Sequence, residues 1–237
     1  MSLYSLPGSR TNPIVYTQIP RPPKELLDRL QGVYVANIAD AMGKPGFYTM
    51  STDIRPAFSD ILMAGPAITV KEMPSCNLMF HKACDLAEAG DVIVIDVGGY
   101  TGVAPGGWNM CRKLVSKGVK GVVVDGAWRD RAEIRKRRFP VFSRGWQPNG
   151  PHKDWPGSVN IPIQCGGVTV KPGDIVVGDD DGIIVIPLEV AESVIEGAKR
   201  IAEYETKNLQ ETRKEVIERH SPYASDEALR KLGVDIR

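Results

Sequence analysis

One stretch of the sequence, residues 91–126, limits the possible folds more than any other. A run of strand-forming residues at 91–97 precedes a loop with five glycines, a helical pattern at 109–118 and a second apolar run at 121–126. This order of strand, helix and strand predicts a right-handed crossover between two parallel strands. The chain is therefore expected to contain a buried parallel sheet and to belong to the α/β class.

The rest of the sequence adds further elements around this unit. The spacing of apolar residues predicts helices over 24–32, 35–44, 77–90 and 128–138, and strands over 67–73 and 140–145. Short apolar runs separated by Gly, Pro and Asp turns predict antiparallel strands from 157 to 187. One long helix is predicted over 188–219, where charged residues occur on most faces.

This pattern divides the chain into three parts. Residues 1–23 are rich in Pro, Ser and Arg and predict an extended arm. Residues 24–187 are expected to form the α/β domain. Residues 188–237 are expected to form a C-terminal helix and tail that pack on a neighbouring subunit.

Composition excludes several classes of protein. The chain has 237 residues, 42% of them hydrophobic, which is enough to form a full core without disulfide bonds or a structural metal. Its 30 Lys and Arg balance 29 Asp and Glu, so no global field favours nucleic acid or a membrane surface. The sequence contains neither a run of about 18 apolar residues nor a secretion leader nor a C-x-x-C pair. We expect a cytoplasmic protein whose four cysteines are reduced and buried.

The glycine loop has the outline of an anion site, and several anions agree with that outline. A dinucleotide fingerprint needs an acid about 20 positions after its glycines, but Gly98 and Asp125 are 27 positions apart. A methyl-donor nucleotide motif is matched only loosely by Asp96, Gly98 and Gly102. A small carboxylate agrees better, because the free amides and dipole of a helix start favour a small anion. A long turn without a ligand is the alternative.

The helix that follows Gly106 and Gly107 supplies the candidate donors. Glycine allows the backbone to approach a ligand closely. The backbone amides of Trp108, Asn109 and Met110 would then face whatever binds at the helix start.

A second group of candidates, Arg129 and Asp130, follows the second apolar run. Since the carboxyl ends of parallel strands share one edge of a sheet, this pair should open onto the same crevice as the glycine loop. Arg129 offers a planar fork for a carboxylate or an enolate oxygen, and Asp130 offers an oxygen ligand for a divalent cation such as Mg²⁺. A bend at Ala127 and Trp128 is expected to aim both side chains. An exposed ion pair that opens a charged helix is the alternative.

These residues and two longer stretches carry a resemblance to a known family. Gly107-Trp108 and, twenty residues later, Arg129-Asp130 are followed by FPVFSRG and by GSVNIPIQCGGVTVKPGDIVVGDDDGIIVIP. From about residue 24 to about 210 the chain resembles the class II pyruvate aldolases that cleave 4-hydroxy-4-methyl-2-oxoglutarate and 4-carboxy-4-hydroxy-2-oxoadipate. That family includes the RraA-like regulators of ribonuclease E activity. The resemblance implies a swivelling β/β/α domain with a C-terminal helical extension, homotrimers or dimers of trimers, and active sites between subunits.

The resemblance also implies a role for each matched residue. The amides of residues 108–110 would hold the carboxylate of pyruvate, Arg129 would bind the keto oxygen and stabilise the enolate, and Asp130 would anchor Mg²⁺ or Mn²⁺. Glu205 of the adjacent subunit, or else Glu203, would join the water shell of the metal. The implied activity is a metal-dependent lyase that releases pyruvate from a small oxo-dicarboxylate, together with oxaloacetate decarboxylase activity through the same enolate.

The sequence departs from the family pattern at one position. Active members carry Asp or Glu twenty residues before Arg-Asp, and this chain has Trp108 there. An indole N–H can only donate, so it cannot accept a proton or a hydrogen bond from a metal-held water. Another acid substitutes, the substrate differs, or lyase activity is lost.

Other candidates favour structural roles. Asp179–Asp181 lack the ligand spacing of an EF-hand loop and are interpreted as a hairpin turn. His81 lies in an amphipathic helix and is interpreted as structural, whereas His152, in a polar loop, is the better candidate for a substrate contact. The basic run Arg135–Arg138 has no interleaved aromatics and is interpreted as a solvated helix end, so no nucleic-acid partner is expected.

Two hypotheses from different classes follow. The first is a metal-dependent lyase, supported by Arg129, Asp130 and the glycine loop. The second is an RraA-like binding protein of the ribonuclease-inhibitor type without lyase activity, which the loss of the acid at Trp108 favours. The sequence leaves the substrate and the metal open.

Overall fold

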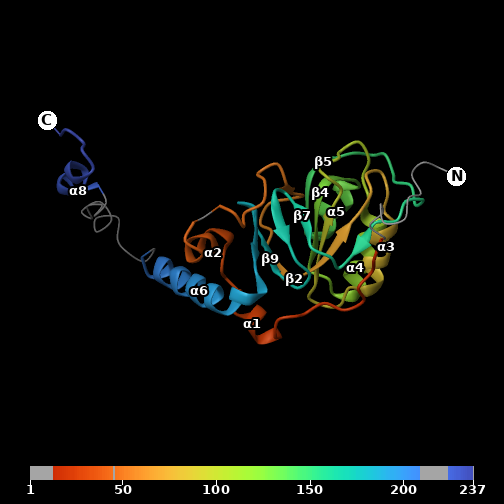
Figure 1. The fold of residues 1–237 in the computed structure, drawn as a ribbon, viewed down its shortest axis with the longest axis horizontal. Helices are drawn as coiled ribbons and strands as arrows, with labels where there is room; N and C mark the ends of the chain where they lie inside the picture. Colours follow the sequence, from red (N-terminus) through yellow and green to blue (C-terminus); the bar gives the residue numbers. More distant parts are fainter. Residues whose placement is uncertain (1–12, 45, 209–223, 237) are drawn as a thin grey trace, which may run out of the picture.

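A computed structural model of the chain describes residues 13–44, 46–208 and 224–236 (Figure 1). Its main sheet contains, in spatial order, β1 (Arg55–Pro56), β5 (Val141–Trp146), β4 (Gly121–Trp128), β3 (Val92–Asp96), β2 (Met63–Lys71), β9 (Ile175–Gly178) and β10 (Ile183–Ile186). The short strand β6 (Ser158–Val159) also pairs with β2, and β7 (Ile163–Cys165) and β8 (Val168–Val170) form a separate hairpin.

The centre of the sheet confirms the predicted crossover. Strands β3 and β4 are parallel, and α4 (Trp108–Lys117) connects them. The helix begins one residue before the predicted range and ends at Gly118, whose φ of 76° is the left-handed conformation that glycine adopts at low cost. Strands β2 and β5 extend the parallel region on either side.

Strand β2 has two halves with different partners. Its first half, residues 63–66, pairs antiparallel with β9, whereas its second half, residues 67–71, pairs parallel with β3. The sequence predicted only the second half, as a strand over 67–73, because Gly65 and Pro66 interrupt the apolar run. The sheet therefore changes character within one strand.

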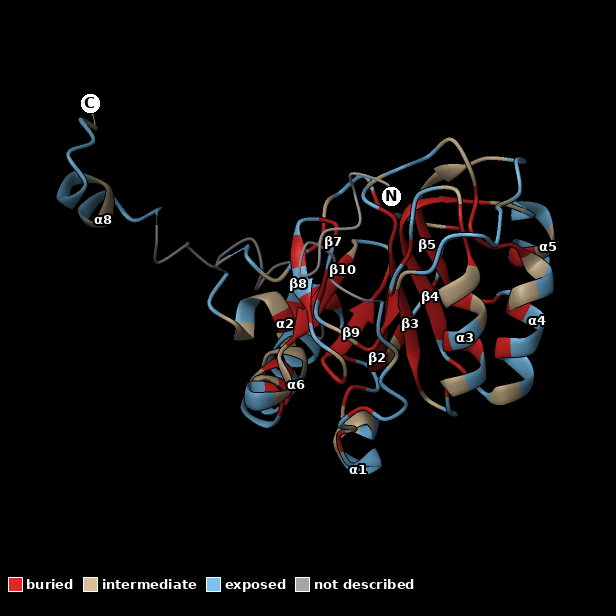
Figure 2. Cartoon of the chain, turned by 45° about the vertical axis from the view of Figure 1, so that its right-hand side comes forward, coloured by how far each residue is buried: buried red, intermediate tan, exposed pale blue. Residues whose placement is uncertain are grey.

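The two faces of the parallel region are covered differently, as Figure 2 shows. Helices α3 (Leu78–Leu86), α4 and α5 (Arg131–Arg137) cover one face, where Phe80, Leu114 and Ile134 pack on the strands. The β7–β8 hairpin and the β9–β10 pair close the other face around Phe142. Both faces of the strands are thus buried, as continuous apolar runs predict.

A third apolar cluster joins three further helices to β9 and β10. Its helices are α1 (Lys24–Asp28), α2 (Val35–Ala41) and α6 (Ala191–Asn208), the last preceded by a 3₁₀ turn at Leu188–Val190. Buried Ile38 and Ile195 face the apolar side of the β9–β10 pair. The predicted helix over 188–219 is observed as far as Asn208, and its part from 209 to 219 lies outside the described residues.

The turn between β9 and β10 is the predicted hairpin. The N–H of Asp179 donates to the carbonyl of Gly182 at 3.0 Å, which closes the turn. One carboxylate oxygen of Asp179 accepts the N–H of Val35 at 2.8 Å at the start of α2. The acidic run therefore has a structural role in joining two parts of the fold.

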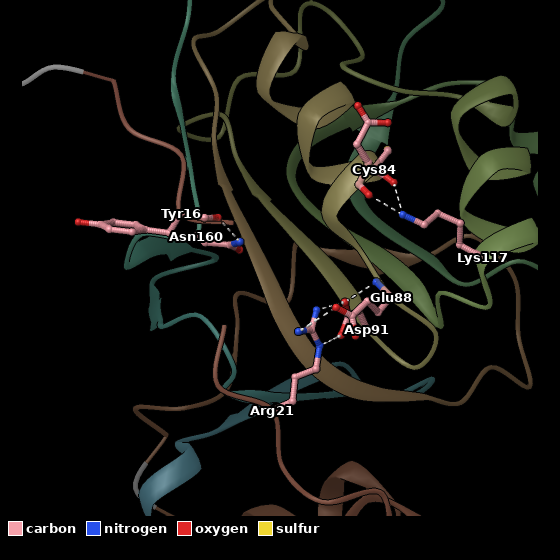
Figure 3. Close-up of polar contacts among 8 residues, drawn as sticks. Tyr16, Arg21, Cys84, Glu88, Asp91, Lys117 and Asn160 are labelled. Atoms are coloured by element: carbon pink, nitrogen blue, oxygen red, sulfur yellow. Dashed lines mark hydrogen bonds and ion pairs between the residues drawn. The ribbon is translucent and has the colours of Figure 1, made fainter. Parts of the chain in front are cut away.

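The described part of the N-terminal arm contacts the α/β domain of the same chain (Figure 3). The carbonyl of Tyr16 accepts a hydrogen bond from the side chain of Asn160, and Arg21 makes two 3.0 Å hydrogen bonds to the carboxylate of Asp91. Asp91 is fully buried, so Arg21 fastens the arm to the start of β3. Packing of the C-terminal helix on a neighbouring subunit stays a prediction.

The structure also bears on two further expectations, the absence of a membrane-spanning helix and the burial of the four cysteines. No helix among the described residues is long and apolar enough to span a bilayer. All four cysteines are buried and free. Burial raises the pKa of Cys84 and of Cys111 to about 12 and that of Cys165 well above its usual value, so these thiols are not activated nucleophiles.

Candidate active site

The glycine loop and the Arg129 loop meet at the carboxyl edge of the sheet, as the sequence predicts. The N–H of Arg129 donates to the carbonyl of Gly106 at 3.2 Å, so the backbones of the two loops are hydrogen-bonded to each other. Residues from both loops line a cavity of about 320 Å³, which we call the glycine cavity. Gly107, Asn109, Met110 and Arg129 all contribute to its lining.

Two glycines lie close to the side chain of Arg129. A Cβ added to Gly107 would lie 2.7 Å from Cγ of Arg129, and one added to Gly150 would lie 2.7 Å from its Nη1. Both separations are far below ordinary van der Waals contact. The absence of a Cβ at both glycines therefore leaves room for the Arg129 side chain between them.

The guanidinium of Arg129 has an unmet hydrogen-bond donor. Its Nε is buried and has no partner among the residues that the structure describes. Buried polar atoms in folded proteins are nearly always paired, with protein, water or ligand. The unmet donor on the cavity wall is therefore a place for an anionic or carbonyl oxygen.

Asp130 is aimed by its own backbone rather than by the expected bend. Strand β4 continues through Ala127 and Trp128, which corrects the predicted bend and the predicted helix start there. The chain turns at Asp130, whose φ of 63° is left-handed, and α5 begins at Arg131. The carboxylate of Asp130 then accepts the N–H of Trp108 at 2.8 Å.

The donors at the start of α4 are fewer than expected. Asp130 occupies the N–H of Trp108, and the N–H of Met110 donates to the carbonyl of Gly107 at 3.1 Å. Of the backbone amides of residues 108–110, that of Asn109 has no hydrogen-bond acceptor among the described residues. A carboxylate ligand would thus meet one free backbone amide and the guanidinium of Arg129.

The side chain of Trp108 packs beside the cavity rather than lining it. Its ring is half-buried against the core below α4, and the guanidinium of Arg137 lies 5.7 Å from its centroid. An arginine over an aromatic face is a favourable arrangement. The basic run therefore contacts aromatic rings from other segments, since Arg138 also stacks on Phe58. At the start of α5, Arg131 stacks on Trp146.

The structure exchanges the positions that the sequence interpretation gave to the two histidines, since His81 and not His152 lies at the cavity. His81 lines the glycine cavity, together with Asn77 and Lys153. Burial, followed by the charges of Lys153 and Lys113, lowers the pKa of His81. His152 is exposed and acts through its backbone, since its N–H donates to the carbonyl of Ser75 at 2.8 Å. No sequence pattern pointed to Asn77 or Lys153.

The electrostatic character of the cavity is positive. Arg129 and Lys153 line it with His81, and no Asp or Glu is among its described lining residues. A cavity walled by one sign of charge attracts the opposite charge. The glycine cavity is therefore suited to an anion.

The remaining predicted metal residue lies elsewhere in its own chain. Glu205 is on α6, and its carboxylate accepts a 2.6 Å hydrogen bond from the amide of Asn37 on α2. Figure 1 shows α6 and α4 at opposite ends of the molecule, so neither Glu205 nor Glu203 reaches the glycine cavity of the same chain. The structure describes no group of three or more His, Cys, Asp or Glu side chains placed to hold a metal.

The first part of the glycine loop belongs to a different cavity. Gly98 and Gly99 line a space of about 310 Å³, together with four charged residues that follow one another across the strand ends: Lys71, Asp96, Asp125 and Arg144. Lys71 pairs with Asp96 at 2.7 Å, and Arg144 pairs with Asp125. We call this space the paired-charge cavity.

A larger cavity, about 620 Å³, lies at the opposite edge of the sheet, between α1 and the starts of β3 and β4. Its acids are paired, Asp91 with Arg21 and Asp28 with Lys24. None of the buried, unpartnered side-chain atoms among the described residues belongs to its lining, in contrast to the glycine cavity.

Comparisons with known proteins agree with this fold. A family model described as RraA-like, Aldolase/RraA, matches residues 35–185. A putative 4-hydroxy-4-methyl-2-oxoglutarate aldolase of Halalkalibacterium halodurans is 39% identical over 163 residues, which cover 69% of this chain and 77% of that protein. A protein of Thermus thermophilus named 4-hydroxy-4-methyl-2-oxoglutarate aldolase is 34% identical over 111 residues, 47% of this chain and 68% of its own length.

A solved structure extends the likeness to the fold. Streptomyces coelicolor RraAS2, described as an unusual member of the RNase ES inhibitor RraA protein family, superposes with a TM-score of 0.71 at 27% identity, over 81% of this chain and 99% of that one. The predicted mixed α/β architecture with a long C-terminal helix is confirmed. The family match spans well over half of the sequence. The chain therefore belongs to the RraA-like family, which the matching model describes as Aldolase/RraA.

Proposed function

We propose that this chain is a carbon–carbon lyase that releases pyruvate from 4-hydroxy-4-methyl-2-oxoglutarate or a closely related oxo-dicarboxylate. The observation that carries the proposal is the buried, unpartnered Nε of Arg129 on the wall of a positively charged cavity. Relatives named as aldolases for this substrate support the same reaction class.

The residues around Arg129 would act on the 2-oxo acid end of the substrate. The substrate carboxylate would accept the free N–H of Asn109, and the keto oxygen would lie against the guanidinium of Arg129. When the C3–C4 bond breaks, its electron pair would move to the pyruvate fragment as an enolate, and the C4 hydroxyl would give its proton to solvent water as it becomes a carbonyl. Protonation of the enolate at C3 by water would complete the release of pyruvate. Arg129 would stabilise the enolate oxygen, where negative charge develops. Loss of CO₂ from oxaloacetate leaves the same enolate.

The donor set of Asp130 is compatible with Mg²⁺ or Mn²⁺. Mg²⁺ usually binds through one or two carboxylates and keeps several waters. Asp130 is exposed, and only one of its oxygens accepts a hydrogen bond, from Trp108. The ion would supply Lewis-acid polarisation of the keto oxygen. Asp130 would hold it in place while the Trp108 amide fixes the orientation of the carboxylate.

The assembly of the active enzyme is part of the proposal. In a homotrimer or a dimer of trimers, Glu205 of one subunit would approach the glycine cavity of the next. A mixture of the Arg129→Ala and Glu205→Gln variants would then regain activity in hybrid oligomers. A mixture as inactive as its components would argue against shared sites.

The direct test is pyruvate release. Purified protein is assayed with 4-hydroxy-4-methyl-2-oxoglutarate and with oxaloacetate, each with Mg²⁺, with Mn²⁺ and with a chelator. We expect metal-stimulated release that Arg129→Ala lowers about 10²- to 10³-fold, the usual cost of removing one donor to a developing oxyanion. Unchanged thermal stability of the variant would show that the fold survives.

A flat trace with every substrate and metal would favour the second candidate, a regulator that acts by binding. The replacement of the family acid by Trp108 favours that candidate, and the likeness to Streptomyces coelicolor RraAS2 agrees with it. Inhibition of a ribonuclease by the Arg129→Ala variant at the potency of the unmodified protein would support it.

A further inference from the structure

Glu72 is a buried acid that the proposed reaction does not use. It follows β2 directly, its side chain belongs to a residue that is 1% exposed, and its N–H donates to the carbonyl of Asp96 at 3.0 Å. Its two carboxylate oxygens accept the N–H groups of Met79 at 3.3 Å and of Phe80 at 2.9 Å. Both donors lie in the first turn of α3. An acid anchored on the sheet therefore holds the start of this helix.

Glu72 supplies the cap that α3 does not provide for itself. The residue at the N-cap position, Asn77, makes no side-chain hydrogen bond to the helix start. The first N–H groups of a helix lack partners within the helix and need an acceptor from elsewhere. Because Glu72 is that acceptor, the side chain of Asn77 can bind outside the helix. Its Nδ2 donates to the carbonyl of Pro105 in the glycine loop at 2.9 Å.

The start of α3 also holds the loop after β5. The N–H of Asn77 donates to the carbonyl of His152 at 3.2 Å, and the N–H of His152 donates to the carbonyl of Ser75 at 2.8 Å. Both this loop and the glycine loop contribute to the lining of the glycine cavity. We call the contacts of Ser75 and Asn77 with Pro105 and His152 the cavity junction.

Phe80 gives a second contact between α3 and the glycine loop. Its ring packs edge-on against Trp128, with 5.5 Å between the ring centroids. A Cβ added to Gly106 would lie 2.8 Å from Cε1 of Phe80, so the backbone of the loop lies directly on this ring. The carbonyl of Gly106 accepts the N–H of Arg129 at 3.2 Å. A shift of the first turn of α3 would therefore move the backbone next to Arg129.

We propose that Glu72 is a positioning residue for the glycine cavity, which it orders by fixing the first turn of α3. Through Asn77 and Phe80, that turn holds the glycine loop in place beside Arg129. The kinetic consequence of this inference rests on the proposed function, whereas its structural consequence is independent of any reaction. An acid that served α3 alone could be removed without a change at the cavity junction.

The test removes the acceptors of Glu72 and measures hydrogen exchange of single backbone amides. Glu72→Met fills the site without an acceptor, and Glu72→Asp withdraws the carboxylate by one methylene. In both variants we expect the amides of Asn77, His152 and Arg129 to exchange about tenfold faster, the size of one net hydrogen bond. Glu72→Gln, which keeps one acceptor oxygen at the same reach, should retain most of the protection.

Asp174→Leu is the matched control. Asp174 is 3% exposed, and its carboxylate also accepts two backbone N–H groups, those of Lys171 at 2.8 Å and of Leu188 at 3.1 Å. It lies in the turn before β9 and does not line the glycine cavity. This variant should speed exchange at Leu188 and leave the cavity junction unchanged. Faster exchange confined to α3 in the Glu72 variants, or an equal change at the junction in Asp174→Leu, would overturn the proposal.

Turnover separates this inference from the proposed function. With 4-hydroxy-4-methyl-2-oxoglutarate, Glu72→Met should lower kcat about tenfold or more, because a displaced Arg129 stabilises the enolate less well. Asp174→Leu should keep the kcat of the unmodified protein. If no pyruvate is released but the junction exchanges faster in Glu72→Met, the lyase proposal fails and the positioning role stands. If pyruvate is released and Glu72→Met changes neither exchange at the junction nor kcat, the lyase proposal stands and the positioning role fails.

Discussion

The two cavities at the carboxyl edge of the sheet contain charged groups in opposite arrangements. In the paired-charge cavity, Asp125 is bound by Arg144 and by the N–H of Gly166 at 2.8 Å, and Lys71 neutralises Asp96. In the glycine cavity, Arg129 has an unmet donor, and no acid lines the wall. The same loop borders both. Charges that satisfy one another stabilise a fold, whereas charges left unmet are available to a ligand.

Replacement of Arg144 by Met tests the structural side of this comparison. The change leaves the carboxylate of Asp125, which is 7% exposed, without its cation. Breaking a buried ion pair from one side costs about 4 kcal/mol in the free energy of unfolding. We expect that loss in urea unfolding, with pyruvate release per folded molecule unchanged. Lys171→Met, which breaks an exposed pair with Glu189, should leave stability nearly unchanged. Lost activity at full stability in Arg144→Met would reverse the assignment.

Glu72 is a buried carboxylate without a cation, and its titration sharpens the same comparison. Burial raises its pKa from 4.5 to about 7, although it accepts the N–H groups of Met79 and Phe80 at the start of α3. A raised folded-state pKa contributes stability that is complete below pH 4.5 and is lost as the pH rises through about 7. We expect the unmodified protein to lose about 3 kcal/mol more than Glu72→Gln between pH 4.5 and pH 8. Parallel pH profiles in urea unfolding would contradict this.

Replacement of Gly150 by Ala tests the catalytic side of the comparison. The added methyl would meet the end of the Arg129 side chain, which is flexible enough to move. A displaced guanidinium should lower kcat/KM about 10²-fold, with the midpoint of thermal unfolding unchanged. Gly145→Ala is the control, because a Cβ there has no neighbour within 4 Å. Equal kinetics of the two variants would remove Arg129 from the reaction.

Replacement of Trp108 by Glu should have the smallest effect. The new carboxylate would start α4 next to Asp130 and restore the acid of the family pattern. We expect metal-stimulated kcat to rise about tenfold, the lower range for groups that orient the surroundings of a metal. The loss of the Arg137 contact should cost about 1 kcal/mol of stability. A decrease in kcat would indicate that Trp108 serves a different substrate.

The sequence predicted the elements whose signals are local. The crossover from β3 to β4 follows from two uninterrupted apolar runs and a glycine that ends the helix between them. The approach of Arg129 to Gly107 follows from the shared edge of parallel strands. The early start of β2 was missed because its first half depends on pairing with β9, more than 100 residues away.

The positions of Asn77, His81 and Lys153 in the lining of the glycine cavity were missed for the same reason. Asn77 and His81 are placed by α3, and Lys153 by a loop that bonds to the start of that helix. No spacing in the sequence connects Lys153 to Asn77 and His81. The interpretation of Arg135–Arg138 as a solvated helix end is confirmed, because all four residues are exposed at the end of α5. Only the contacts of Arg137 with Trp108 and of Arg138 with Phe58 were not predicted, since both rings come from other segments.

Strand β2 belongs to two structurally different parts of the molecule. Since its first half pairs with β9 and its second half with β3, one backbone links the α1, α2 and α6 part to the part that carries the glycine cavity. The outer part could then change its helices and neighbours while the glycine cavity keeps its shape. One inherited chemistry would thereby be compatible with many different quaternary surroundings.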